Sequence, residues 1–253
     1  MRTFAVDLLQ VEVHPDRPAM GLAAASEGLR LLRRALAKGP LAHVVFAAAP
    51  SQQEMLHALC EAKDVDWGRV HAYHMDNYIG LDDTARQQFS AFLKARIFGR
   101  LPFGAVHYMG NRPEQARDYA DLLAKIQVDL CFMGVGENGH IAFNDPGNAF
   151  FDDPESVKTV TLDHACRMQQ VNEGNFAALE HVPTQALTLT IPALMASRHI
   201  ICTVPGINKA PAVRRMLQGP VDEGVPASIL RRHPAARLYL DQPAASLLAA
   251  PAR

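Results

Sequence analysis

The chain has 253 residues, of which 49% are apolar and 20% are charged, and its formal net charge is −1. This balance excludes the basic surface of a nucleic-acid-binding protein and a polybasic membrane anchor. A chain of this length buries a large core without metals or disulfides, so we expect a single domain over residues 1–253.

The four cysteines are far apart and form no Cys-x-x-Cys pair; they are Cys60, Cys131, Cys166 and Cys202. We therefore expect reduced thiols rather than a disulfide framework or a zinc site. The N-terminus does not resemble a signal peptide, because Asp7 interrupts its apolar residues early. No apolar run reaches the length of a membrane span, so we expect a cytoplasmic protein.

Short β-rich runs alternate with helical stretches along the chain. Helices are expected over residues 19–38, 52–62, 85–98, 113–126 and 208–217, and strands over residues 41–48, 69–74, 128–133, 186–190, 199–204 and 237–240. Ser51 is expected to cap the second helix. The alternation predicts an α/β fold, a doubly wound three-layer sandwich with a mostly parallel central sheet. The polar residues 147–175 show little periodicity and are expected to form an irregular, mobile flap over a site.

Ligands of a doubly wound sheet bind beyond the carboxyl ends of its strands. Four loops are expected there, and they carry Ser51, Asp76, His140 and Lys209. A hydroxyl, a carboxylate, an imidazole and an ammonium together suit proton transfer on a phosphorylated small molecule.

The glycines of the third loop match the spacing of a dinucleotide fingerprint, Gly134-x-Gly136-x-x-Gly139. That fingerprint needs a helix to begin at its last glycine. Residues 140–147 end instead in turn residues. We therefore expect the glycines to let the backbone approach a substrate and to present His140.

His140 is flanked by Asn138 and Asp145. A carboxylate bonded to one ring nitrogen fixes the tautomer and prepares the other nitrogen for acid–base catalysis. The alternative is a structural histidine. Asp76 is either a base at a strand end or a turn cap, and Lys209 is either a phosphate ligand at a helix N-terminus or a solvated lysine.

A metal site is not expected. The spacing His71-x-x-His74-x-Asp76 contains ligand types. However, His71 and His74 point to opposite faces of a strand, and zinc ligands converge more tightly.

Taken in order, these loops resemble the glucosamine-6-phosphate deaminase (isomerase) family, within a wider group that includes 6-phosphogluconolactonases. The matching stretches are residues 75–81, 139–146, 182–188, 206–210 and 228–234. The string Ile-Ala-Phe-Asn after Gly139 and His140 is typical of deaminases rather than lactonases.

The resemblance implies conversion of glucosamine 6-phosphate and water into fructose 6-phosphate and ammonia, without metal or organic cofactor. It implies that Asp76 moves a proton between C2 and C1 of the opened sugar and that His140 assists ring opening. The implied phosphate ligands are Lys209 and the loop at Ser51, Gln52 and Gln53. The implied small-molecule partner is an amino-sugar phosphate. Because the family contains both monomers and homo-oligomers, the resemblance also allows another copy of the chain as a partner.

The sequence departs from the family pattern around the implied site. The loop before Gln52 is rich in alanine instead of glycine and threonine, and Asn77 follows the implied base where an acid is frequent. Asn138 stands where many members carry aspartate, and Asp145 where they carry glutamate. An amide can orient the imidazole but supplies no charge; Glu137 or Asp145 could supply it.

Two arginines of the family lack clear counterparts. Arg167 is the nearest candidate for the arginine that binds phosphate, and Ser156 stands where an allosteric arginine is expected. Two alternatives therefore stay open: a lactone hydrolase, which needs His140 but not Asp76, and a sugar-phosphate-binding regulator without turnover. The sequence also leaves the sugar epimer open.

Overall fold

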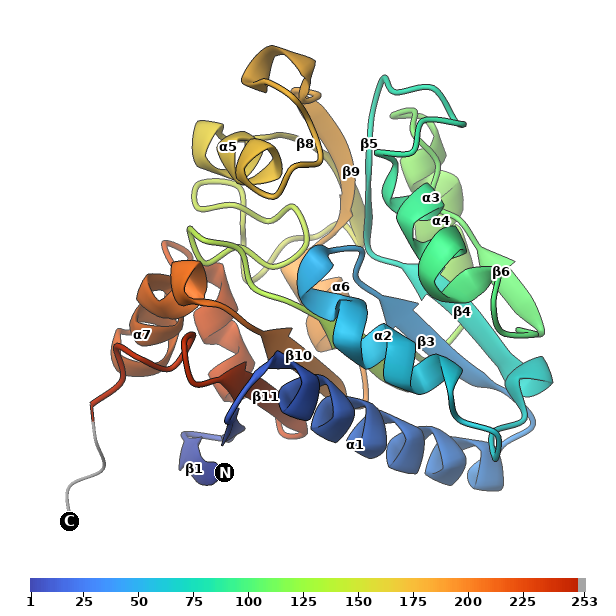
Figure 1. Ribbon diagram of the computed structural model, residues 1–253. Coiled ribbons are helices and arrows are strands. Elements are labelled where there is room, and N and C mark those ends of the chain that lie inside the picture. Colours follow the sequence, from blue (N-terminus) through green and yellow to red (C-terminus); the bar gives the residue numbers. More distant parts are fainter. Residues whose placement is uncertain (250–253) are drawn as a thin grey trace.

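The computed structural model describes residues 1–249, and its central feature is an eight-stranded sheet (Figure 1). From one edge to the other the strands are β1 (Arg2–Val6), β2 (Leu9–His14), β11 (Ala236–Asp241), β10 (Ile200–Val204), β7 (Leu130–Met133), β3 (Ala42–Phe46), β4 (Val70–His74) and β6 (Ala105–His107). All neighbours are parallel except β1 and β2, which form an antiparallel hairpin. The predicted α/β fold with a mostly parallel sheet is confirmed.

Helices cover both faces of this sheet because its strands are apolar on both faces. The helices are α1 (Arg17–Lys38), α2 (Gln53–Cys60), α4 (Gln115–Leu123), α6 (Ile191–Met195) and α7 (Ala210–Gln218). Along β3 the side chains alternate: Val44 and Phe46 pack with Leu32 of α1, whereas Val45 packs in the cluster that holds Val213 of α7. Figure 1 shows α1 and α2 together in front of the sheet.

A second, antiparallel sheet stands above the first in Figure 1. It contains β5 (Asp76–Tyr78), β9 (Gln185–Leu189) and β8 (Val157–Thr161), with β9 in the middle. The strand expected at residues 186–190 therefore exists but belongs to this smaller sheet.

The prediction that residues 147–175 are irregular was wrong. They contain β8 and a helix, α5 (His164–Asn172), which begins at an Asp163 N-cap. Both elements are short and half exposed, so their apolar residues are too few to produce a clear period. Movement of this segment stays a prediction.

Two local predictions also need correction, and one hairpin was missed. Ser51 caps no helix, because it lies inside a 3₁₀ turn, Pro50–Gln52, that precedes α2. The helix expected from residue 85 begins later, as α3 (Phe89–Leu93), and continues as a wider π turn, Lys94–Phe98. The β1–β2 hairpin was not predicted; its turn places Asp7 at a positive φ of 51°.

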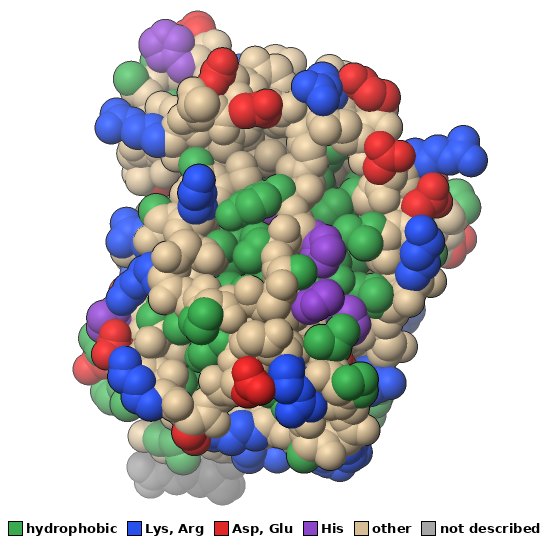
Figure 2. All heavy atoms as spheres, turned by 90° about the vertical axis from the view of Figure 1, so that its right-hand side faces the viewer, with side chains coloured by type: hydrophobic (Ala, Val, Ile, Leu, Met, Phe, Trp, Pro, Cys, Tyr) green, Lys and Arg blue, Asp and Glu red, His purple; other side chains and the backbone are tan. Residues whose placement is uncertain are grey.

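Histidine side chains gather near the β6 edge of the sheet, which faces the viewer in Figure 2. His43, His71 and His107 come from neighbouring strands, with ring centroids 5.5 Å apart for the first two and 5.6 Å for the last two. His74 binds elsewhere: its Nδ1 donates to the Asp76 carbonyl and its Nε2 accepts from Met109 N. His71 and His74 therefore share no site.

Among residues 1–249, no helix is both long and apolar enough to cross a membrane. The single-domain organisation stays a prediction, and residues 250–253 of that range lie outside the described residues.

Candidate active site

A cavity of about 530 Å³, including the solvent space at its mouth, lies at the carboxyl ends of β3, β4, β7 and β10. From β3 the chain winds outward through β4 and β6, and from β7 it winds the opposite way through β10. The crevice between β3 and β7 is therefore the topological switch point, where α/β sheets bind ligands. The walls come from the loops after these four strands and from α5.

The loops after β3 and β7 touch at Gly134. A Cβ on this residue would lie 2.9 Å from Gln52 Nε2 and 3.1 Å from Ser51 Oγ, so a larger residue here would displace these two side chains. Ser51 lines the cavity. Gln52 lies beneath it, fully buried, with Nε2 donating to Ser51 Oγ at 3.1 Å and to the Thr203 carbonyl at 3.4 Å.

Gln53 also lies away from the cavity. Its backbone N–H donates to the Pro50 carbonyl, and its side chain lines a separate depression beside Arg96. Of the three residues expected in a phosphate loop, the structure thus brings only Ser51 to the cavity wall.

Gly136 forms the floor under the His140 imidazole. A Cβ here would come within 2.2 Å of the ring, and Gly136 N donates to the His140 carbonyl at 2.9 Å. Gly139 does not line the cavity. It turns the backbone at a φ of +98°, and a Cβ on it would lie 3.1 Å from Val225 Cγ1. The glycines mount the histidine, and the loop leads into turns rather than a helix.

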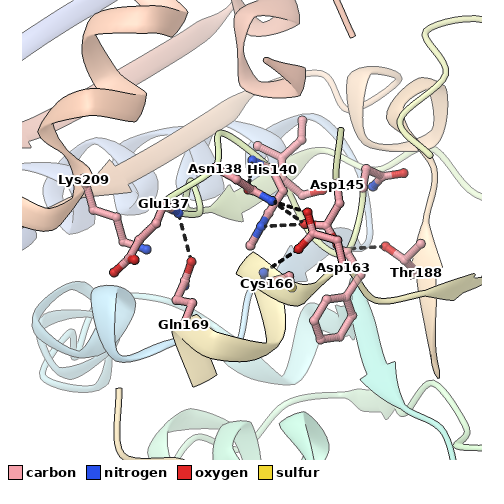
Figure 3. Close-up of polar contacts among 12 residues, drawn as sticks. Glu137, Asn138, His140, Asp145, Asp163, Cys166, Gln169, Thr188 and Lys209 are labelled. Atoms are coloured by element: carbon pink, nitrogen blue, oxygen red, sulfur yellow. Dashed lines mark hydrogen bonds and ion pairs between the residues drawn. The ribbon is translucent and has the colours of Figure 1, made fainter. Parts of the chain in front are cut away.

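The His140 ring is held by a buried carboxylate, because Nδ1 lies 3.0 Å from Asp145 Oδ1 (Figure 3). Burial raises the pKa of Asp145, but the hydrogen bond and charge of His140 and the hydrogen bond from Asn138 outweigh it, so the net shift is downward. An ionised Asp145 keeps a proton on Nδ1 and leaves Nε2 as the acceptor.

Asn138 does not touch the imidazole, contrary to the prediction that its amide orients the ring. Its Nδ2 donates to Asp145 Oδ1 at 2.9 Å and to Asp163 Oδ2 at 3.1 Å, and its Oδ1 accepts from His140 N at 3.0 Å. It acts through the backbone and through Asp145, and it holds two carboxylates together.

Asp76 opens β5 and lines the same cavity with only 6% of its surface exposed. Its Oδ1 has no hydrogen-bond partner within the described part of the chain. Burial raises the pKa of this carboxyl well above its ordinary 3.8. A carboxyl with a raised pKa and an oxygen without a hydrogen-bond partner is a candidate base for proton transfer.

His74 fixes the backbone of Asp76. The two hydrogen bonds of its ring require a neutral imidazole with the proton on Nδ1. Burial lowers the pKa of His74 and the hydrogen bond to the Asp76 carbonyl raises it in part, so that the net value is about 4.

Lys209 comes from the 3₁₀ turn Ile207–Lys209, between β10 and α7, and it lines the cavity. The turn begins at Gly206, whose φ is 97° and whose N–H donates to the Asp241 carboxylate. Arg167 lies elsewhere: its Nη2 donates to the carbonyls of Leu179 and Val182, so its proposed contact with phosphate is not supported.

Four site residues on α5 or directly at its ends were not predicted from the sequence. Gln169, Gln170 and Glu173 line the cavity, and Asp163 binds Asn138. The one signal for this helix is Asp163 itself, a good N-cap residue ahead of residues 164–172.

Within residues 1–249, one group of three side chains could hold a metal ion. The ligand atoms of His140, Asp145 and Cys166 all lie within 4.8 Å of one another. An ion bound there would occupy the contact between His140 Nδ1 and Asp145.

Comparison with known proteins identifies a family and several relatives. A family model described as glucosamine-6-phosphate isomerases/6-phosphogluconolactonase matches residues 15–239. The glucosamine-6-phosphate deaminase of Streptococcus thermophilus is 36% identical over 222 residues, which cover 86% of this chain and 92% of the relative. The Oenococcus oeni enzyme of the same name is 32% identical over 232 residues, covering 90% and 95%.

Two solved structures share the fold. A monomeric glucosamine-6-phosphate deaminase matches with a TM-score of 0.86 at 24% identity, covering 94% of this chain and 99% of that one. A 6-phosphogluconolactonase from Thermotoga maritima matches with a TM-score of 0.75 at 18% identity, covering 92% and 99%. From the match over residues 15–239 and the relatives above 30% identity, the chain belongs to the glucosamine-6-phosphate isomerase/6-phosphogluconolactonase family.

Proposed function

We propose that this enzyme converts glucosamine 6-phosphate and water into fructose 6-phosphate and ammonia. The observation that carries the proposal is Asp76, a buried carboxyl that lines the same cavity as His140 and Lys209 and whose Oδ1 has no hydrogen-bond partner among residues 1–249. The curated relatives named glucosamine-6-phosphate deaminase support it.

The first step in this proposal is opening of the sugar ring. His140 Nε2 takes the proton from the C1 hydroxyl and returns it to the ring oxygen as the C1–O5 bond breaks. Asp145 stabilises the transient positive charge on the imidazole, since it lies 3.0 Å from Nδ1. The open form carries an aldehyde at C1 and an amine at C2.

Asp76 then moves one proton between adjacent carbons. It removes the C2 proton while the C1 carbonyl oxygen gains a proton, which gives an enolamine. The same carboxyl then returns its proton to C1 while the nitrogen loses one, so that in sum one proton also passes from the nitrogen to the C1 oxygen. C1 is thereby reduced to an alcohol and C2 is oxidised to an imine. Water hydrolyses the imine to the ketone and ammonia, so no external oxidant or reductant is needed.

A raised pKa suits Asp76 to both halves of this transfer. A base that is too weak cannot abstract the carbon proton, whereas an acid that is too weak cannot return it. Burial raises the pKa of this carboxyl well above its ordinary 3.8, which makes its carboxylate a stronger base toward the C2 proton. At the far end of the substrate, Lys209 and Ser51 are the proposed phosphate ligands.

The test is product analysis of the purified protein with glucosamine 6-phosphate, its C4 epimer galactosamine 6-phosphate and 6-phosphogluconolactone. We expect ammonia and a ketose 6-phosphate from an amino-sugar phosphate. Lactone hydrolysis without ammonia release would identify a lactonase instead, and saturable calorimetric binding without any product would identify a binding protein.

A further inference from the structure

The end of the cavity proposed for phosphate contains a carboxylate beside its lysine. Among the residues that line the cavity in the described part of the chain, Lys209 is the only lysine or arginine. Its Nζ lies 3.7 Å from Glu173 Oε1, and Glu173 lines the same cavity. The charge available to attract a substrate anion is therefore already paired.

Glu173 is fixed in this position by hydrogen bonds. Gln169 Nε2 donates to Glu173 Oε1 at 2.7 Å. Gln169 Oε1 in turn accepts from Glu137 N at 2.9 Å, as Figure 3 shows. The Lys209 and Glu173 side chains are only 9% and 20% exposed. A pair held in this way, largely out of water, is screened less than a surface ion pair.

The rest of α5 supplies no compensating cation. Gln169 and Gln170 present amides to the cavity, and Arg167 donates to the carbonyls of Leu179 and Val182. Burial lowers the pKa of Lys209, while the charges of Glu173 and Glu137 raise it in part, so both carboxylates act on the ammonium. A substrate phosphate would meet Lys209 together with its counter-ion.

We propose that Glu173 is a specificity-determining residue that competes with the substrate phosphate for Lys209. The identity of the anion rests on the proposed function. A phosphate must displace Glu173 or bind beside its negative charge, and either course weakens binding. The preference of the site for a phosphorylated over a free amino sugar is therefore smaller than Lys209 alone would give.

The test measures inorganic phosphate binding by calorimetry, which needs no turnover. Glu173→Gln keeps an amide oxygen for Gln169 but removes the charge, and we expect it to bind phosphate about tenfold more tightly than the wild type. Glu173→Ala should act in the same direction. Glu114→Gln removes the same charge from an exposed position, so it should leave the dissociation constant within about twofold.

Equal or weaker phosphate binding by both Glu173 variants would overturn the proposal, and so would no phosphate binding by any of the proteins. A protein that lacks deaminase activity but shows tighter phosphate binding in Glu173→Gln would contradict only the proposed function. If the enzyme is active, the ratio of kcat/KM for glucosamine 6-phosphate to that for glucosamine should rise in Glu173→Gln, mainly through KM.

Discussion

At the scale of single residues, the cavity combines two buried carboxyls whose pKa values shift in opposite directions. Asp76 has an unpaired oxygen, and burial raises its pKa. Asp145 is as deeply buried, yet the hydrogen bonds and charge around it outweigh burial and lower its pKa. One carboxyl is therefore prepared to exchange a proton, whereas the other stays ionised and holds His140.

This difference predicts the pH dependence of activity. Asp76 must be ionised to accept the C2 proton, so kcat/KM for glucosamine 6-phosphate should fall about tenfold per pH unit below its raised pKa. A pH–rate profile measures this acid limb. A profile that stays flat down to pH 3.8, the ordinary value for the carboxyl, would contradict the assignment.

The role of Asn138 leads to a second prediction. Asn138→Asp would replace the donor that bridges Asp145 and Asp163 with a third carboxylate. We expect a loss of about 1–3 kcal/mol in the free energy of unfolding, together with weaker catalysis, because the buried Asp145 and the partly buried Asp163 lose this donor. Urea unfolding measures the loss. Asn172→Asp on exposed α5 surface is the matched control, and equal stability of both variants would refute the bridging role.

The residue types at the strand ends were enough to predict, from the sequence alone, that four side chains share one cavity. They are Ser51, Asp76, His140 and Lys209. Side-chain direction was not predictable. Gln52 points away because it donates to the Thr203 carbonyl, 151 residues along the chain. Arg167 points away because it donates to the carbonyls of Leu179 and Val182, in the segment that follows α5.

At the scale of elements, the longer strands and helices were predictable and the short ones were not. Helix α1 has enough turns to show its apolar face, and β3 and β10 are short runs in which four of the five residues are apolar. The elements β5, β8 and α5 are short, and their pairing depends on distant partners such as β9. The residues of α5 that line the cavity were missed for that reason.

The close packing of α1 against α2 leads to a prediction about the free energy of unfolding. A Cβ at Gly21 would lie 2.5 Å from Glu54 Cβ and 2.9 Å from the α2 backbone. Gly21→Ala should therefore lower the free energy of unfolding by about 1–3 kcal/mol, because the helices must separate. Leu22→Ala, at an exposed position of the same helix, should change it by less than about 0.5 kcal/mol. If Gly21→Ala leaves the free energy of unfolding unchanged, the two helices do not pack this closely.

At the scale of the whole molecule, the fold divides its tasks between two sheets. The parallel sheet, covered on both faces, carries the loops with Ser51, His140 and Lys209 at its carboxyl edge. The smaller antiparallel sheet begins with Asp76 and packs above that edge. The candidate base thus comes from a different sheet than its partners do.

The cysteines report on the integrity of this whole structure. All four are free and buried, and burial raises the pKa of each thiol. We expect negligible reaction with a thiol reagent in the native protein and four reactive thiols in denaturant. Fewer than four in denaturant without reductant would contradict the prediction of reduced cysteines.

The most direct test compares the wild type with Asp76→Asn. The variant should fold. Because its raised pKa means that Asp76 favours folding only while protonated, this contribution is lost as the pH rises from 3.8 through the folded-state pKa. An uncharged amide should therefore be at least as stable at neutral pH. The measurement is ammonia and fructose 6-phosphate formed from glucosamine 6-phosphate: equal amounts from the wild type and none from a folded Asp76→Asn. Undiminished ammonia release by the variant, or none by the wild type, would contradict Asp76 as the base of a deaminase.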